Sequence, residues 1–183
     1  MKRLVGLVLV ALSLIESPMA LADSVKGEMV LDGNRMKFAD PDGWYSFRTP
    51  VTGETAQNED GTRTFMWDSS DGKYYFNVSR GKAETPIPAD QLDAAVQQMI
   101  TPGSADDLAI AKDVTAITGR EVITLNGPQP VKMAVWHVEV NGGKLFYGVL
   151  LVPKGSMAII CLGDRPDCGT LLTNDFRIEA GAF

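Results

Sequence analysis

The chain has 183 residues and a formal net charge of −6, with 45% hydrophobic and 22% charged residues, which is the composition of a globular protein with a sizeable core. An acidic chain without a cluster of Lys and Arg is a poor match to proteins that bind nucleic acid or anionic lipid. One histidine and two cysteines exclude most protein-ligated zinc sites.

The N-terminus has the three parts of a secretory signal peptide. Lys2 and Arg3 provide the positive charge, residues 4–15 are apolar, and Ala20-Leu21-Ala22 supplies the small residues that signal peptidase requires. We expect residues 1–22 to be removed by cleavage between Ala22 and Asp23, leaving residues 23–183 as a single domain in the periplasm or outside the cell. No later apolar run approaches the roughly 18 residues of a membrane span, so we expect no stable membrane insertion after cleavage.

Five segments in the first half of this domain have the turn-bounded pattern of strands. They span residues 28–31, 35–39, 44–49, 62–68 and 73–80. Asp32-Gly33-Asn34 separates the first two, and Gly and Asn accept the positive φ of a hairpin turn. These segments predict antiparallel hairpins.

The period changes between residues 88 and 102. Leu92, Val96, Met99 and Ile100 recur at the i, i+4, i+7 and i+8 spacing of an amphipathic helix. Thr101-Pro102-Gly103 ends it, and we expect a strand over residues 109–117.

Four further strands are predicted over residues 121–125, 131–140, 144–152 and 156–162, separated by Gly-containing turns. The last two are almost continuously apolar, so we expect them to be covered on both faces. Residues 169–176 predict a short helix with Leu172 and Phe176 on one side. Two helices and many hairpins indicate an α+β fold.

The two cysteines are Cys161 and Cys168, separated by six residues. In an oxidising compartment an even pair at this spacing predicts a structural disulfide. A free or redox-active pair is the alternative, although thioredoxin-type pairs have two intervening residues.

The order of elements resembles the PsbP-like superfamily. An opening hairpin and a short aromatic strand ending in proline (Gly43-Trp44-Tyr45-Ser46-Phe47-Arg48-Thr49-Pro50) come first, and the chain closes in Asn174-Asp175-Phe176-Arg177-Ile178. That superfamily includes a photosystem II extrinsic subunit, a nuclear-import Ran-binding factor and many small exported bacterial proteins. The resemblance covers roughly residues 34–179 and implies a central antiparallel β-sheet with helices on both faces. It also implies a role as an accessory or partner-binding protein, with no catalytic residues carried over.

His137 is the one imidazole available for catalysis. On its strand it shares a face with Val135 and Glu139, so a His-Glu pair could serve as base and orienting group of a hydrolase. No G-x-S-x-G motif supplies a nucleophile. A partly exposed structural histidine is the favoured interpretation, and we assign no catalytic residue.

Three acidic turns could hold calcium loosely, at residues 40–43, 59–61 and 68–72. None has the spacing of an EF-hand loop, and Asp and Gly are common in turns for conformational reasons. No glycine-rich phosphate loop is present either. We therefore expect no metal and no cofactor.

Two surfaces are candidates for binding a partner. The segment between the cysteines would present Asp164, Arg165 and Asp167 on a loop constrained by the disulfide, although a simple structural staple is the favoured interpretation. The second candidate is a group of aromatic residues, most of them expected in the core: Trp44, Tyr45, Phe65, Trp67, Tyr74 and Tyr75.

These observations predict a non-enzymatic exported protein that binds another protein of the cell envelope. An immunity or inhibitor protein for a secreted effector is one form of this function. A small-molecule carrier with a pocket between sheet and helix is the first alternative, and a hydrolase centred on His137 is the second.

Overall fold

The computed structural model describes residues 28–32, 35–50, 53–57, 63–69, 72–112, 114–141, 143–163 and 171–183. The first half contains the strands β1 (Glu28–Asp32), β2 (Arg35–Ala39), β3 (Tyr45–Pro50), β4 (Gly53–Gln57), β5 (Arg63–Ser69) and β6 (Gly72–Lys82). Two helices follow, α2 (Ala89–Met99) and α3 (Ala105–Ala111), and then four long strands, β7 (Ala116–Leu125), β8 (Val131–Val140), β9 (Gly143–Val152) and β10 (Gly155–Gly163). The C-terminal segment consists of a π-helical turn η2 (Leu171–Asp175), the strand β11 (Phe176–Ile178) and a 3-10 turn η3 (Ala180–Ala182).

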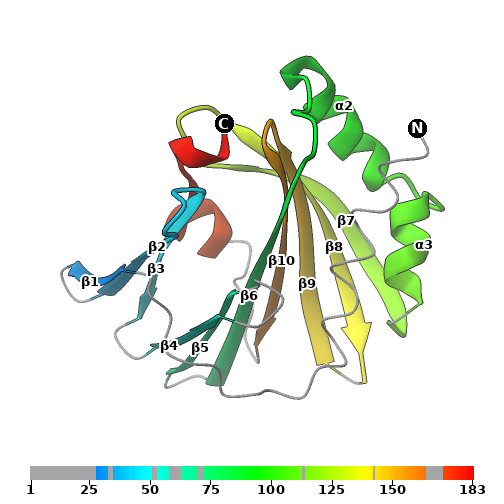
Figure 1. Cartoon of the computed structure of the whole chain (residues 1–183). Coiled ribbons are helices and arrows are strands. Elements are labelled where there is room, and N and C mark those ends of the chain that lie inside the picture. Colours follow the sequence, from blue (N-terminus) through cyan, green and yellow to red (C-terminus); the bar gives the residue numbers. More distant parts are fainter. Residues whose placement is uncertain are drawn as a thin grey trace.

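The strands form two antiparallel sheets (Figure 1). The large sheet has the order β4-β5-β6-β10-β9-β8-β7, and the small sheet has the order β1-β2-β3-β11. Most neighbours in the large sheet are joined by short hairpins, and the pairing of β6 with β10 brings its two halves together. The predicted α+β class with antiparallel strands is confirmed.

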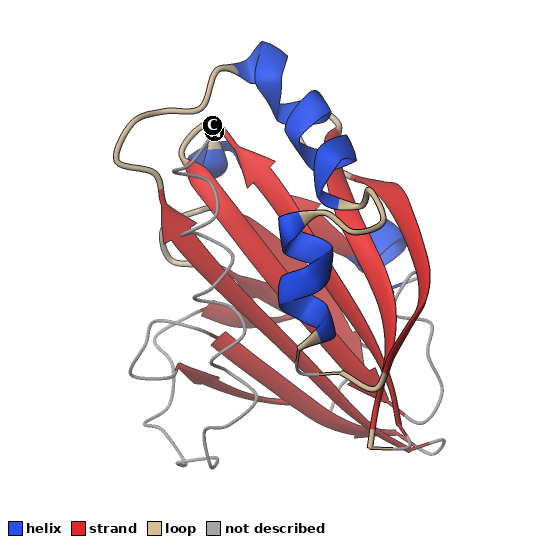
Figure 2. Cartoon of the chain, turned by 90° about the vertical axis from the view of Figure 1, so that its right-hand side faces the viewer, coloured by secondary structure: helices blue, strands red, loops and turns tan. Residues whose placement is uncertain are grey.

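The large sheet lies between two different layers. Both α-helices cover one of its faces (Figure 2), and α2 contacts β8 and β9. The small sheet and the C-terminal segment cover the other face, where η2 contacts β7 and β3. The predicted flanking by helices on both faces is therefore not confirmed as such, because a four-stranded sheet provides much of the second layer.

Each face of the large sheet has its own apolar core, because successive residues of a strand point to opposite sides. On β8, Val131, Met133 and Val135 pack toward the small sheet. Ala134, Trp136 and Val138 pack toward the helices. Strand β9 is buried from Phe146 to Val152, so its predicted coverage on both faces is confirmed.

The helix α3 corrects one prediction, since we expected a strand over residues 109–117. Ser104 caps the helix by accepting a hydrogen bond from the backbone N–H of Asp107 at 3.0 Å, and Asp107 and Ile110 point inward at helical i, i+3 spacing. Strand β7 begins only at Ala116 and is longer than predicted. The short strands β4 and β11 were not predicted.

Within the described ranges, no helix is long and apolar enough to cross a membrane. The predicted signal peptide, residues 1–22, lies outside those ranges.

Candidate functional site

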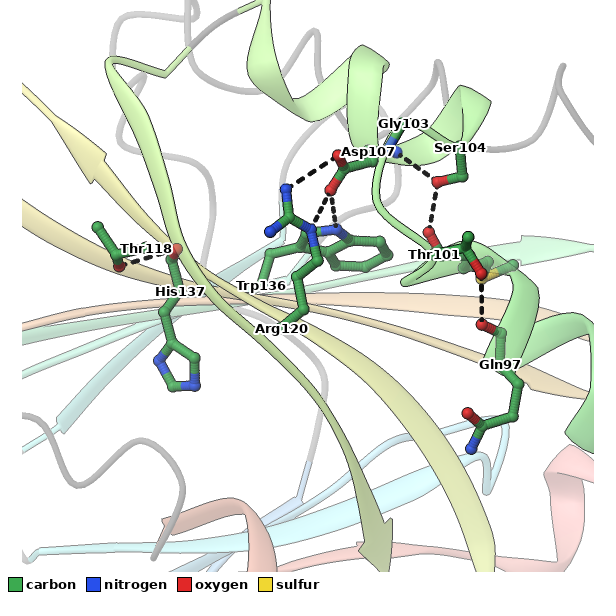
Figure 3. A network of polar contacts seen from close by, with 10 residues as sticks. Gln97, Thr101, Gly103, Ser104, Asp107, Thr118, Arg120, Trp136 and His137 are labelled. Carbon is green, nitrogen blue, oxygen red and sulfur yellow. Dashed lines mark hydrogen bonds and ion pairs between the residues drawn. The ribbon is translucent and has the colours of Figure 1, made fainter.

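The turn between α2 and α3 belongs to a network of polar contacts in the described part of the chain (Figure 3). Gly103 adopts a φ of 78°, in the left-handed region that favours glycine. The hydroxyl of Ser104 donates to the carbonyl of Met99 at 2.6 Å while it caps α3. The turn therefore places the start of α3 directly after the end of α2.

Asp107 is the centre of this cluster, which we call the Asp107 network: Asp107, Arg120, Trp136, Gly103 and Ser104. Asp107 is 5% exposed, and its carboxylate accepts two hydrogen bonds from the Arg120 guanidinium, from Nε at 2.6 Å and from Nη2 at 3.0 Å. The indole Nε1 of Trp136 donates at 3.2 Å, and the backbone N–H of Gly103 donates at 3.1 Å. The hydrogen bonds from Arg120 hold the pKa of Asp107 below its ordinary value.

The Asp107 network connects α3 to two strands, because Arg120 belongs to β7 and Trp136 to β8. Both carboxylate oxygens are occupied, so Asp107 is suited to anchoring the helix rather than to binding a ligand. The next residue, Leu108, lies about 100° further around the helix and is 58% exposed. Among the residues whose side chains the structure describes, Leu108 is the one large hydrophobic residue that is highly exposed.

A second buried polar group lies beside the Asp107 network without a partner. Tyr147 on β9 is 4% exposed, and its hydroxyl makes no hydrogen bond. Its ring centroid is 5.9 Å from that of its cross-strand neighbour Trp136. Burial, with a smaller contribution from the charge of Asp106, raises the pKa of Tyr147 well above its ordinary value.

His137 is paired with a different glutamate from the one that the sequence suggested. Its Nε2 lies 2.8 Å from Oε1 of Glu121 on β7, not near Glu139, and both side chains are about half exposed. The ring also contacts the edge of Phe146 on β9, with centroids 5.6 Å apart. Glu121 approaches because β7 lies beside β8 in the sheet, whereas Glu139 lies two residues along His137's own strand. The expected hydrolase pair His137–Glu139 is therefore not formed.

The acidic turn at residues 40–43 is engaged by an arginine. Arg80 on β6 donates to Asp40 at 3.0 Å and also contacts Asp42, and its guanidinium lies 5.5 Å from the ring centroid of Trp44. The turn thus connects the small sheet to the large one. Among the described residues, no group of three or more His, Cys, Asp or Glu is arranged to hold a metal ion.

A small open pocket lies at the end of the sheet nearest the C-terminus. Its walls come from α2, β8, β9 and the last residue, and include Leu92, Asp93, Val96, Lys132, Leu151 and Phe183. Lys132 and Asp93 form an ion pair of 2.5 Å on its wall. The pocket is small and its accessible lining is more polar than apolar, so a small polar molecule is what it could accept.

Cys161 is disulfide-bonded and 2% exposed. Its expected partner Cys168 lies outside the described residues, so the pairing stays a prediction. The candidate loop residues Asp164, Arg165 and Asp167 lie outside them as well. Of the aromatic group, Trp44 and Tyr45 are in the core, at 3% and 1% exposure, and the other four side chains are not described.

No family model, curated protein or solved structure matches this chain. The likeness to the PsbP-like superfamily therefore stays a prediction that rests on the order of elements, and the geometry of the described residues carries the functional argument.

Sequence reasoning missed the Asp107 network and Tyr147. The spacing Ser104-x-x-Asp107 was a usable signal for a helix cap. Nothing local indicated that Arg120 and Trp136 would meet Asp107, because the three residues come from three different elements.

Proposed function

We propose that this is an exported, non-enzymatic protein that binds another protein of the cell envelope. In this proposal the signal peptide is cleaved between Ala22 and Asp23, and the mature chain acts in the periplasm or outside the cell. The observation that carries the proposal is the presentation of Leu108. An apolar side chain stands exposed on a helix that the Asp107 network fixes to the sheet.

Leu108 is suited to protein contact because its orientation is set before binding. A side chain held in its bound orientation loses less conformational entropy on association. An apolar anchor on a surface helix fits an apolar recess of a partner, which is a common arrangement at the centre of protein interfaces. A partner with this recess and a basic rim would complement the net charge of −6.

We also propose a PsbP-like arrangement, with helices on both faces of the large sheet. It is supported by α2 and α3 on one face and by η2, whose Leu172 packs in the core of the other face. A role as an immunity or inhibitor protein for a secreted effector is one form of the proposed function, and the loop of Asp164, Arg165 and Asp167 would then also contact the effector.

The test is affinity capture from the native cell envelope with the wild-type protein, Leu108→Asp and Thr85→Asp. Leu108 is 58% exposed and contributes little to the core, so Leu108→Asp is expected to fold. Thr85 lies in an exposed bend, and its variant adds the same charge elsewhere. We expect one stoichiometric protein with wild type and Thr85→Asp, and at least about tenfold less of it with Leu108→Asp, a loss typical of an interface anchor.

Equal capture by all three proteins would show that Leu108 is not in the interface. Clean wild-type protein without any stoichiometric partner would contradict the proposed function itself.

The pocket beside Phe183 is the observation behind a second candidate, a carrier of small molecules. Replacing Val96, 1% exposed on the pocket wall, would disturb the core, so Leu92→Trp is the better probe. If the protein is a carrier, Leu92→Trp should weaken the binding of an aliphatic carboxylate measured by calorimetry, and Leu108→Asp should not.

A further inference from the structure

The attachment of α3 to the sheet depends on few groups. The helix spans seven residues, too few to be stable without tertiary contacts. Two of its residues are buried, Asp107 in the Asp107 network and Ile110 among the apolar residues under the helices. Loss of the Asp107–Arg120 contact would therefore remove the main polar attachment of the helix.

One polar group beside α3 opposes this attachment. The hydroxyl of Tyr147 is buried without a hydrogen bond, and it faces the same side of the sheet as Trp136. The charge of Asp106, in the first turn of α3, acts on Tyr147. A buried polar group without a partner costs free energy that is recovered when water reaches it. The Tyr147 hydroxyl would regain water if α3 moved away.

The connection to α2 can absorb such a movement. Gly103 has a positive φ, and no atom would lie within 4 Å of a Cβ built on it. This part of the backbone is therefore uncrowded. Ser104 is bonded to Thr101 and Met99 on the α2 side. The N–H of Gly103 donates to Asp107, so this bond has to break or Gly103 has to move with α3 when the helix opens.

We propose that α3 opens from the sheet as a local unit, and that the Asp107–Arg120 contact is the latch that keeps it closed. The unpartnered hydroxyl of Tyr147 lowers the stability of the closed form. Opening is a local event, so it occurs at a lower free energy than unfolding of the large sheet.

This inference rests on the proposed function in one respect, the role of Leu108. A partner that contacts Leu108 in its latched position binds the closed form only. Its apparent dissociation constant is then the intrinsic constant divided by the closed fraction. The latch and the Tyr147 hydroxyl thus change the affinity for the partner, without touching it, only as far as they change the closed fraction.

The test is native-state hydrogen exchange, followed by NMR on the free protein as recovered after export. The reporters are the indole N–H of Trp136 and the amides of Leu108 to Ala111, compared with the amides of β9. We expect the α3 reporters of the wild-type protein to exchange at least about tenfold faster than the central amides of β9, as for a local opening.

Two variants should move the α3 reporters in opposite directions. Tyr147→Phe keeps the ring and removes the unpartnered hydroxyl, so exchange in α3 should slow by about three- to tenfold, the equivalent of one poorly satisfied hydroxyl. Arg120→Met removes the latch and should accelerate hydrogen exchange in α3 at least about tenfold. If Arg120→Met does not fold, Arg120→Lys, which keeps the charge and loses the bidentate geometry, should give a smaller acceleration.

Tyr45→Phe is the matched control, because it removes a tyrosine hydroxyl from the core on the other side of the large sheet. It should leave exchange in α3 unchanged. The inference is overturned if the α3 reporters exchange only at the rate of β9, or if Tyr147→Phe accelerates them.

The exchange experiment involves no partner, so it separates the two proposals. Slow, global exchange in α3 together with loss of capture by Leu108→Asp would reject the latch and keep the proposed function. Local opening in a protein that captures no stoichiometric partner would keep the latch and reject the proposed function, and local opening with undiminished capture by Leu108→Asp would remove only Leu108 from the interface.

Discussion

Asp106 and Asp107 are neighbours in the chain, and the protein gives their carboxylates opposite environments. Hydrogen bonds from Arg120 lower the pKa of Asp107, whereas burial raises the pKa of Asp106. Ionised Asp107 therefore stabilises the folded protein, and ionised Asp106 destabilises it. The difference arises because successive helical residues point in directions about 100° apart, so one side chain reaches β7 and the other does not.

Asp107→Asn should lower the free energy of unfolding by about 2–3 kcal/mol near pH 7, because it removes a charged acceptor and leaves the Arg120 guanidinium poorly paired. The folded-state pKa of Asp107 lies below the ordinary value of 3.8. Its contribution is thus complete above that value and is lost as the pH falls through the lower, folded-state value. Urea unfolding of both proteins between about pH 7 and pH 2 measures this, and a difference that stays constant down to the lowest pH would contradict it.

Asp106→Asn provides the control with the opposite sign. Removing a carboxylate whose pKa is raised by burial should leave stability equal or slightly higher near neutral pH. That gain should disappear as the pH falls and the wild-type carboxyl takes up a proton. A loss of stability as large as that of Asp107→Asn would show that Asp106 has a favourable partner.

At the scale of elements, the turn between β9 and β10 approaches β6 too closely for a side chain. Gly155 has a φ of 156°, and a Cβ built there would lie 2.0 Å from the carbonyl oxygen of Gly81. Ala83 and Ile87 also donate backbone hydrogen bonds to this turn, to the carbonyls of Lys154 and Pro153 at 2.9 Å each. The β9–β10 hairpin therefore holds residues 83–87, the segment that connects β6 to α2, through backbone hydrogen bonds.

Gly155→Ala should destabilise the protein by about 3 kcal/mol or more, since backbone atoms have to move. Gly81→Ala on the facing strand is the matched control. Its Cβ would meet Ser156 Oγ at 3.4 Å, an ordinary contact, so the expected change is within about 1 kcal/mol. Thermal unfolding of the two variants gives the comparison, and equal shifts would show that the turn has room to adjust.

At the scale of the whole molecule, ion pairs and the C-terminal segment connect the two sheets. Arg80 on β6 reaches Asp40 in the turn before β3, and Arg35 on β2 makes a bidentate contact with Asp175 in η2 at 2.5 and 2.8 Å. Strand β11 then completes the small sheet beside β3, and Ile178 donates to the carbonyl of Asn126 at 2.8 Å. The C-terminal segment thus completes the small sheet, which covers one face of the large sheet.

The disulfide of Cys161 should stabilise this closure. If its partner is Cys168, the closed loop has about eight residues, and reduction should lower the free energy of unfolding by roughly 2.5 kcal/mol. Peptide mapping under non-reducing conditions identifies the bonded partner. A linkage to another molecule would contradict the predicted pairing, and unchanged stability on reduction would contradict its structural role.

Features that depend on local periodicity could be predicted from the amino-acid sequence. The alternation along β8 assigned Trp136 and Val138 to one face and Val135 to the other, and the spacing of Leu92, Val96 and Met99 located α2. These predictions succeed because side-chain direction repeats every 2 residues in a strand and every 3.6 in a helix, whatever the rest of the chain does.

Which side chains meet across elements depends on the packing of the folded chain. Glu121, rather than Glu139, pairs with His137 because β7 lies beside β8 in register, and Asp107 reaches Arg120 and Trp136 because α3 lies across both strands. The same contacts explain why residues 109–111 are helical although their apolar character predicted a strand. A capped seven-residue helix is stabilised by the ion pair and by Ile110, which are contacts to other elements rather than intrinsic preferences.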